Sequence, residues 1–373
     1  MWPLLFLALG QVSRTVAQNC TLGESPFETI RTPEDINEIV QNCSILDGRL
    51  SIGIDYSGPF HVPNLINITG ALRSVEEGSR DALGITSFDM PDLEGVLDID
   101  LYWMPDLTEW STPKLKKADL FLLVPTNIPL EFPALESADY IDIATNASKV
   151  SFPALKTVGA FGIGSFGNWD TTAVTAMNVS VPSLQSAGKV LISTNASSVS
   201  LPNLTSIVGG NTYANSYSEF QLAGTTVSVD LPKLGIVDGG LAFIGNISSL
   251  SLPRLRKVTG AFQMTAYEPL SLDLPLEEVD SIYLSGLIES VHFPSLRSWR
   301  RFSVDSDSYI DCEDLERRLN ETLDAPPGEF ECLSPGPRRP DSDSAEDVAG
   351  RFAKGGIGAI VAVASVVGFI LLC

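Results

Sequence analysis

The sequence predicts a mostly β protein: a right-handed parallel β-solenoid of about twenty-residue leucine-rich repeats, whose ends are closed by caps held with disulfides. Three observations predict this fold. A four-residue word, apolar-Pro-x-Leu, recurs along the chain, short alternating strand patterns separate its copies, and helical spacing is almost absent between residues 50 and 310. A unit of about twenty residues is too short for a strand and a full helix. Each unit is therefore expected to be a coil of short strands that buries its inward side chains against the coils on either side.

The proline of the repeated word marks each unit. Full copies of the word lie at Pro63, Pro91, Pro105, Pro133, Pro153, Pro182, Pro202, Pro232, Pro253 and Pro294, and degenerate copies at Pro113 and Pro275. From Pro113 to Pro294 the successive spacings are 20, 20, 29, 20, 30, 21, 22 and 19 residues. Proline has no N–H for a strand ladder, so we expect it at a corner of each coil. The apolar residue before it and the Leu two residues after it should point inward.

Strand patterns fill the rest of each unit. Alternating runs rich in β-branched and aromatic residues follow the Leu, for example at 140–143, 190–193, 241–244, 261–264 and 281–284. Two units carry about ten extra residues, 164–177 and 211–222, which we expect to bulge from a corner. The second insertion contains Tyr213, Tyr217 and Phe220. Such loops can carry binding, but they also arise as ordinary length variation.

Each end of the repeat array is predicted to carry a cap, because an open end would expose strand edges that invite aggregation. Residues 18–47 form the N-terminal cap, 48–310 the repeats and 311–333 the C-terminal cap. A short helix is predicted in each cap, at residues 33–40 and 311–323.

Four of the five cysteines fall into two local pairs, which indicates an oxidising compartment, and Cys373 lies in the C-terminal apolar segment. Cys20 and Cys43 lie in the first cap, and Cys312 and Cys332 in the second. Four cysteines allow three pairings, and proximity favours Cys20–Cys43 and Cys312–Cys332. The sequence has no CxxC motif and no histidine near either pair, so we expect no metal there.

The first residues are typical of a targeting segment. A short apolar run precedes small residues, so residues 1–17 are predicted to be a secretory signal. A buried first strand is the alternative.

The C-terminal residues follow the pattern of a glycosylphosphatidylinositol (GPI) attachment signal. Small residues are followed by a polar spacer, 346–354, and an apolar segment, 355–373. A single-pass helix is the alternative. The predicted parts are a linker at 334–343, attachment at Asp343, with Ser342 or Ser344 as alternatives, and a removed propeptide at 344–373.

Many glycosylation signals accompany these segments. The Asn-x-Ser/Thr sites are Asn19, Asn42, Asn67, Asn146, Asn178, Asn195, Asn203, Asn246 and Asn320. In a secreted chain each is a candidate surface glycan. The net charge of −22 argues against nucleic acid or an anionic membrane face as a partner.

Residues suited to catalysis are few. Hydrolysis of a glycan typically needs two carboxylates, and Asp98 and Asp100 share one strand face, with Asp142 expected nearby. Carboxylates at alternating strand positions are more often a solvated face. His61 and His292 both precede the repeated word and look like repeat-position residues. We therefore expect no catalytic residue and no enzyme.

No metal or other cofactor is expected either. Asp305, Asp307 and Asp311 are suggestive of calcium, but they lack the glycine and the terminal glutamate of an EF-hand loop.

Two functions from different classes remain open. The first is a structural or organising glycoprotein at the cell surface. The second is a receptor or adhesin that binds a wall polysaccharide or a protein through one face of the repeats. Tyr102, Trp103 and Trp110 could form a sugar-stacking patch on that face.

The chain resembles a known family in the order of its motifs. Cys20 and Cys43 are followed by Gly48-Arg49-Leu50-Ser51-Ile52, and then come the repeats, Cys312 and Cys332, with many glycosylation signals and the GPI signal. In these features it resembles the fungal GPI-anchored cell-wall organisation proteins of the sporulation-specific wall-protein type, related to leucine-rich receptor L-domains. The resemblance covers residues 18–373. It implies a surface mannoprotein, without established catalytic residues, that supports wall assembly and integrity.

Overall fold

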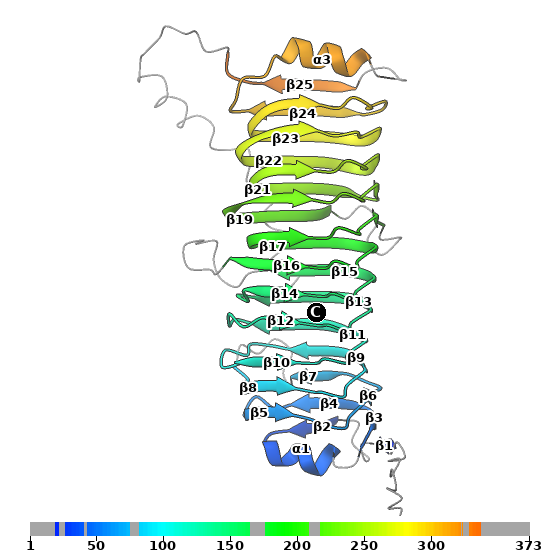
Figure 1. Cartoon of the computed structure of the whole chain (residues 1–373), viewed down its shortest axis with the longest axis vertical. Coiled ribbons are helices and arrows are strands. Elements are labelled where there is room, and N and C mark those ends of the chain that lie inside the picture. Colours follow the sequence, from blue (N-terminus) through cyan, green and yellow to red (C-terminus); the bar gives the residue numbers. More distant parts are fainter. Residues whose placement is uncertain are drawn as a thin grey trace, which may run out of the picture.

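The computed structural model is an elongated stack of strands with one short helix at each end (Figure 1). The structure describes residues 19–21, 27–40, 43–74, 82–164, 176–208, 217–321, 323 and 328–336. The predicted signal, attachment residue and propeptide, and all but the first three residues of the predicted linker, lie outside these ranges.

Most described residues are in strands. The N-terminal strands are β1 (Asn19–Thr21), β2 (Phe27–Ile30), β3 (Ile45–Asp47), β4 (Arg49–Ile52), β5 (Ser57–His61), β6 (Asn67–Ile68), β7 (Leu72–Ser74), β8 (Gly84–Asp89), β9 (Gly95–Leu101) and β10 (Glu109–Ser111). The central strands are β11 (Lys117–Val124), β12 (Leu130–Glu131), β13 (Ser137–Thr145), β14 (Lys149–Ser151), β15 (Thr157–Gly164), β16 (Met177–Ser180), β17 (Ser186–Ser200) and β18 (Ser206–Ile207). The C-terminal strands are β19 (Tyr217–Asp230), β20 (Ile236–Val237), β21 (Gly240–Ser251), β22 (Lys257–Asp273), β23 (Glu278–His292), β24 (Arg301–Ser306) and β25 (Glu329–Leu333). The helices are α1 (Pro33–Val40) and α3 (Cys312–Glu321).

The strands pair in parallel with the equivalent strand of the next unit. Ser137 of β13 lies in register with Thr157 of β15, and Thr157 with Ser186 of β17. Of the described strands, 22 belong to one parallel sheet, while β5, β8 and β10 form a second. The repeat predicts a parallel sheet in which paired residues lie about one unit apart in the sequence. This prediction is confirmed.

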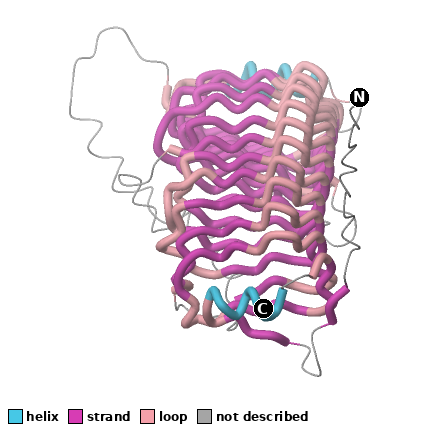
Figure 2. Tube along the Cα trace, turned by 60° about the horizontal axis from the view of Figure 1, so that its bottom comes forward, coloured by secondary structure: helices cyan, strands magenta, loops and turns pink. Residues whose placement is uncertain are grey.

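The repeated word forms a tight turn between strands. The N–H of Leu155 donates to the carbonyl of Phe152 over 3.4 Å, and the N–H of Leu255 donates to that of Leu252 over 3.1 Å. The proline therefore occupies the second position of a four-residue turn, where its fixed φ is favoured. These turns stack on one another into a column of loops (Figure 2). As expected, the apolar residue and the Leu of each full word are buried.

Aromatic side chains fill the interior of the first units. Stacked pairs join Phe60 to Phe88 at 5.2 Å between ring centroids, Phe88 to Trp110 at 4.2 Å, and Phe132 to Phe152 at 4.9 Å. The first three rings lie three residues before the proline, whereas Phe132 and Phe152 lie directly before it. The large side chain thus changes position within the unit while the interior stays filled.

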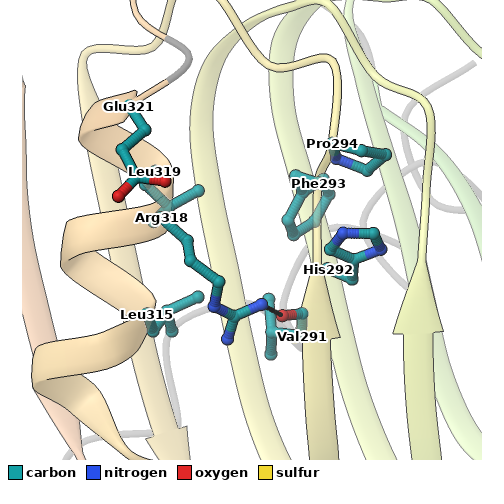
Figure 3. Close-up of a pocket in the computed structure, with 8 residues that line it drawn as sticks. All are labelled: Val291, His292, Phe293, Pro294, Leu315, Arg318, Leu319 and Glu321. Atoms are coloured by element: carbon teal, nitrogen blue, oxygen red, sulfur yellow. Dashed lines mark hydrogen bonds between the residues drawn. The ribbon is translucent and has the colours of Figure 1, made fainter.

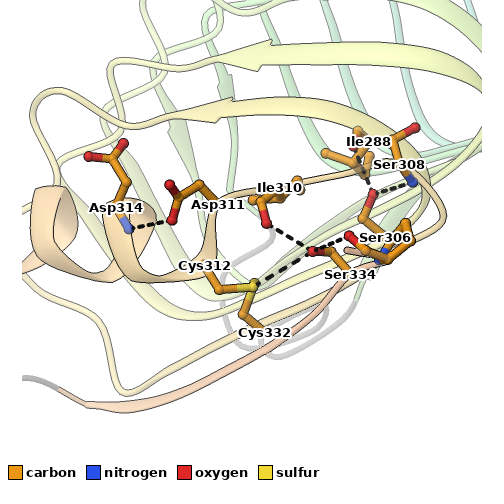
Figure 4. Close-up of a disulfide and its surroundings, with 10 residues drawn as sticks. Ile288, Ser306, Ser308, Ile310, Asp311, Cys312, Asp314, Cys332 and Ser334 are labelled. Carbon is orange, nitrogen blue, oxygen red and sulfur yellow. Dashed lines mark hydrogen bonds between the residues drawn. A yellow bond between two sulfur atoms is a disulfide. The ribbon is translucent and has the colours of Figure 1, made fainter. Parts of the chain in front are cut away.

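Both predicted disulfides are present. Cys20–Cys43 joins Cα atoms 5.6 Å apart, and Cys312–Cys332 joins Cα atoms 5.8 Å apart. At the second one, the hydroxyl of Ser334 donates to the carbonyl of Ile310 over 2.8 Å (Figure 4).

The cap segments continue the stack as well as covering its ends. β1 pairs with β3, β2 with β4, and β25 with β24. Helices α1 and α3 lie at opposite ends of the stack (Figure 1), and α3 buries Leu315 and Leu319 against it. The caps are therefore the terminal coils with a helix added.

The second predicted insertion ends earlier than expected, because residues 217–222 belong to a strand. Tyr217 begins β19, and Phe220 is fully buried, with its ring 5.0 Å from that of Phe243. Assigning Phe220 to a bulging loop was wrong, because an aromatic residue at an alternating inward position is core. Tyr213 lies outside the described residues.

Candidate functional site

One row of outward side chains departs from the repeat. Arg73 of β7, Asp100 of β9, Phe121 of β11, Asp142 of β13 and Gly162 of β15 lie side by side in register. Adjacent members are one strand spacing apart, about 4.8 Å. A phenyl ring is therefore flanked on each side by a carboxylate.

Arg73 organises the two predicted carboxylates. Its guanidinium donates to both oxygens of Asp98, over 2.8 and 2.9 Å, and lies 3.8 Å from Asp100. The side chains of Arg73, Asp98 and Asp100 are 27%, 17% and 14% exposed. Both carboxylate oxygens of Asp98 are therefore occupied by one guanidinium. Asp98 and Asp100 do share one face, as expected, but as partners of an arginine that the sequence reasoning missed.

Asp142 has different surroundings. Burial raises the pKa of its carboxyl, and the hydroxyl of Tyr140, which donates to Oδ2 over 3.1 Å, partly opposes that rise. On the other side lies Gly162, where a Cβ atom would come within 3.0 Å of Asp142 Oδ1. A side chain at this position would crowd the carboxylate, so the glycine accommodates Asp142.

Aromatic rings adjoin these carboxylates. The ring centroids of Tyr102 and Phe121 are 5.2 Å apart, and Tyr140 is 36% exposed. We call Tyr102, Phe121 and Tyr140, together with Asp100 and Asp142, the aromatic–acidic face. Sequence reasoning missed Phe121 and Tyr140 as site residues, although the spacing of 21 residues from Asp100 to Phe121 and from Phe121 to Asp142 could have aligned them.

One residue of the predicted sugar-stacking patch, Trp110, is not on the surface. Trp110 is only 8% exposed, stacks on Phe88, and donates its indole N–H to Thr112 over 3.2 Å. It belongs to the interior because it occupies an inward position of its unit. Trp103 is 36% exposed, has a φ of 51° and lies on the surface between β9 and the turn at Pro105.

A separate pocket of about 250 Å³ lies at the C-terminal cap, between α3 and the end of β23 (Figure 3). Leu315 and Leu319 provide apolar walls. Arg318 points across the pocket, where it donates to the carbonyl of Val291 over 3.4 Å and to Asp314 over 2.8 Å. Because the guanidinium is held by these groups, the pocket resembles a packing gap beneath the cap helix.

The two histidines occupy equivalent positions, as expected. Nδ1 of His61 lies 2.7 Å from Asp89, and Nδ1 of His292 lies 2.9 Å from Asp273. Each pair joins adjacent units directly before the repeated word.

The glycosylation signals differ in exposure. Asn19, Asn178 and Asn320 are exposed, and Asn67, Asn146, Asn203 and Asn246 are half-buried. Asn195 is 9% exposed, and the amide of Asn146 donates to the carbonyl of Pro125 over 3.2 Å. Asn42 lies outside the described residues.

Among the described residues, no group of three or more His, Cys, Asp or Glu side chains is placed to hold a metal ion. Neither described helix is long and apolar enough to cross a bilayer. Compared with known proteins, the chain matches no family model, no curated protein and no solved structure.

Proposed function

We propose that the chain is a non-enzymatic, GPI-anchored surface glycoprotein that supports the organisation and integrity of a fungal cell wall. In this proposal the stack is a right-handed parallel β-solenoid of receptor L-domain-like repeats. Residues 1–17 are removed as a signal, residues 344–373 are exchanged for the lipid, and Asp343 carries it. The partners are the membrane, through the lipid, and wall polysaccharide or wall proteins.

One observation carries the proposal: a long parallel stack is closed at both ends by a disulfide-held terminal coil. Disulfides persist in oxidising compartments, which supports secretion. A helix at each end covers strand edges that could otherwise invite pairing with another chain. A rigid rod that carries an exposed glycan acceptor on its side, at Asn178, and another on its end helix, at Asn320, suits a spacer or organiser in a polysaccharide matrix.

The bidentate arginine pair at Asp98 supports the non-enzymatic part of the proposal. Cleavage of a glycosidic bond requires one carboxylic acid that can protonate the leaving oxygen. Both oxygens of Asp98 already accept hydrogen bonds from Arg73, so Asp98 is poorly placed to reach a leaving oxygen.

The test is made on intact cells that express the chain. Phosphatidylinositol-specific phospholipase C should release the protein, and mass spectrometry should find a mature C-terminal peptide that ends at Asp343. Retention on the cells together with an intact peptide from residues 355–373 would overturn the anchor.

The organising role is tested separately. Cells that lack the chain should become more sensitive to wall-perturbing dyes, and the full chain carrying Asp98→Asn and Asp100→Asn should restore resistance. Failure of this variant to restore resistance, at normal surface levels, would contradict a non-enzymatic role.

A further inference from the structure

We propose that the aromatic–acidic face binds an amino-sugar chain, that is, a β-linked saccharide whose rings carry free amines. This inference concerns a binding site and does not depend on the anchor or on the organising role.

The arrangement of rings favours a saccharide. Phe121 lies between Asp100 and Asp142 in one register row, and Tyr102 packs 5.2 Å from Phe121. A pyranose ring presents an apolar C–H face that can pack on an aromatic ring, while its polar groups project outward at the rim. Carboxylates one strand spacing to either side of the phenyl ring, about 4.8 Å away, are placed to meet those groups.

The charge of the face favours an amine. Three carboxylates, those of Asp98, Asp100 and Asp142, accompany one guanidinium, that of Arg73, which already lies beside the first two carboxylates. Burial raises the pKa of Asp142, so its charged form is costly there, and an ammonium brought beside it would offset that cost. Ammonium groups also gain from the faces of aromatic rings. Gly162 accommodates the carboxylate, because a side chain there would come within 3.0 Å of Asp142 Oδ1.

The backbone of this face argues against an extended peptide. Peptides often add as a strand to a free sheet edge. Here β11 pairs with β9 and β13, and β13 pairs with β11 and β15, so neither strand offers an edge. A ligand must therefore be recognised by side chains, and a sugar ring that stacks on Tyr102, Phe121 or Tyr140 meets this requirement.

Calorimetry on the purified full-length chain tests the proposal with a β-1,4-linked glucosamine hexamer. The matched ligands are its fully N-acetylated form, a neutral β-glucan hexamer and hexalysine. We expect the glucosamine hexamer to bind at least about tenfold more tightly than each of the others, because only it combines rings with charge.

Three variants locate the site. Asp142→Asn keeps the shape of the side chain and removes its charge, and Phe121→Leu keeps apolar volume and removes the ring face. Each should weaken binding by about tenfold. Tyr267→Ala is the control, because Tyr267 is an exposed tyrosine of β22, at 57%, outside this face. It should leave binding unchanged.

Several results would overturn the inference. Equal binding of hexalysine would indicate a general attraction of polycations, and equal binding of the acetylated hexamer would remove the role of the amine. Binding that survives Asp142→Asn in a folded protein, judged by circular dichroism, would place the ligand elsewhere. Absence of binding to the glucosamine hexamer would reject the site altogether.

Discussion

The interior and the outer face of the same coils follow different rules. Inside the first units, a large ring occupies one of two inward positions, as at Trp110 and Phe132, and the interior stays filled. Outside, the row of Phe121 continues through Leu191, Glu219 and Tyr283 in later coils, with no common chemistry. Packing density constrains the interior of each unit, whereas the outward side chains are free to differ. A local departure on the outer face can therefore carry binding without affecting the fold.

The largest difference in stability between the two regions should appear when a buried tryptophan and an exposed tryptophan are each replaced by alanine. Trp110→Ala removes a ring packed between Phe88 and Phe132, so we expect the free energy of unfolding to fall by about 3–5 kcal/mol. Trp103→Ala is the matched control on the surface and should cost less than about 1 kcal/mol. Urea denaturation followed by circular dichroism measures both. Equal losses would contradict the distinction between interior and surface.

The two ends should respond alike to loss of their disulfides. The cysteine pairs are separated by 23 and 20 residues, so each closure restricts the unfolded chain similarly. Cys20→Ser with Cys43→Ser, and Cys312→Ser with Cys332→Ser, should each cost about 3 kcal/mol. Thermal unfolding of the two double variants checks the match, and a loss at only one end would show that the other cap is held by packing alone.

On the outer face, replacing Asp142 is expected to increase stability slightly, whereas the replacements above decrease it. Because burial raises the pKa of Asp142, the folded protein binds its proton more tightly than the unfolded chain does. Stability therefore falls as pH rises from the ordinary carboxyl range through the raised pKa, and the cost of the charge persists at pH 7.

Asp142→Asn should remove that cost and raise the free energy of unfolding at pH 7 by up to about 1 kcal/mol. This gain in stability should vanish at pH values below those at which an ordinary Asp titrates. There the carboxyl of Asp142 is protonated in both the folded and the unfolded protein. Urea melts of both proteins across this pH range test the sign, and a variant less stable than the parent at pH 7 would contradict it.

The smallest effect should come from the ion pairs between neighbouring coils. Nζ of Lys116 lies 2.7 Å from Glu94, but both side chains are about half exposed. Lys116→Ala should change stability by less than about 1 kcal/mol, and added salt should reduce the difference further. Denaturation at low and high salt provides the measurement.

The sequence predicted the parts of the molecule that repeat. Pro153 and its equivalents located the turns, because a residue without an N–H must leave the ladder, and alternation located the strands. Phe220 was misplaced because an insertion shifts the strand start by a few residues, which spacing alone does not reveal.

The site was harder to predict because it depends on register. Arg73 and Asp98 are 25 residues apart and meet only because β7 lies beside β9. Trp110 illustrates the converse difficulty. A tryptophan near surface aromatics in sequence points inward or outward according to a shift of one residue.

The proline turns also have a consequence for how the molecule can change in size. Each unit begins and ends at the same kind of corner, so a duplication of about twenty residues between two corners inserts a whole layer. The two capped ends then move apart by one strand spacing, about 4.8 Å, and each keeps its own contacts. Length thus becomes a property that evolution can adjust in fixed increments, while the terminal coils and the side chains on any chosen face are inherited intact.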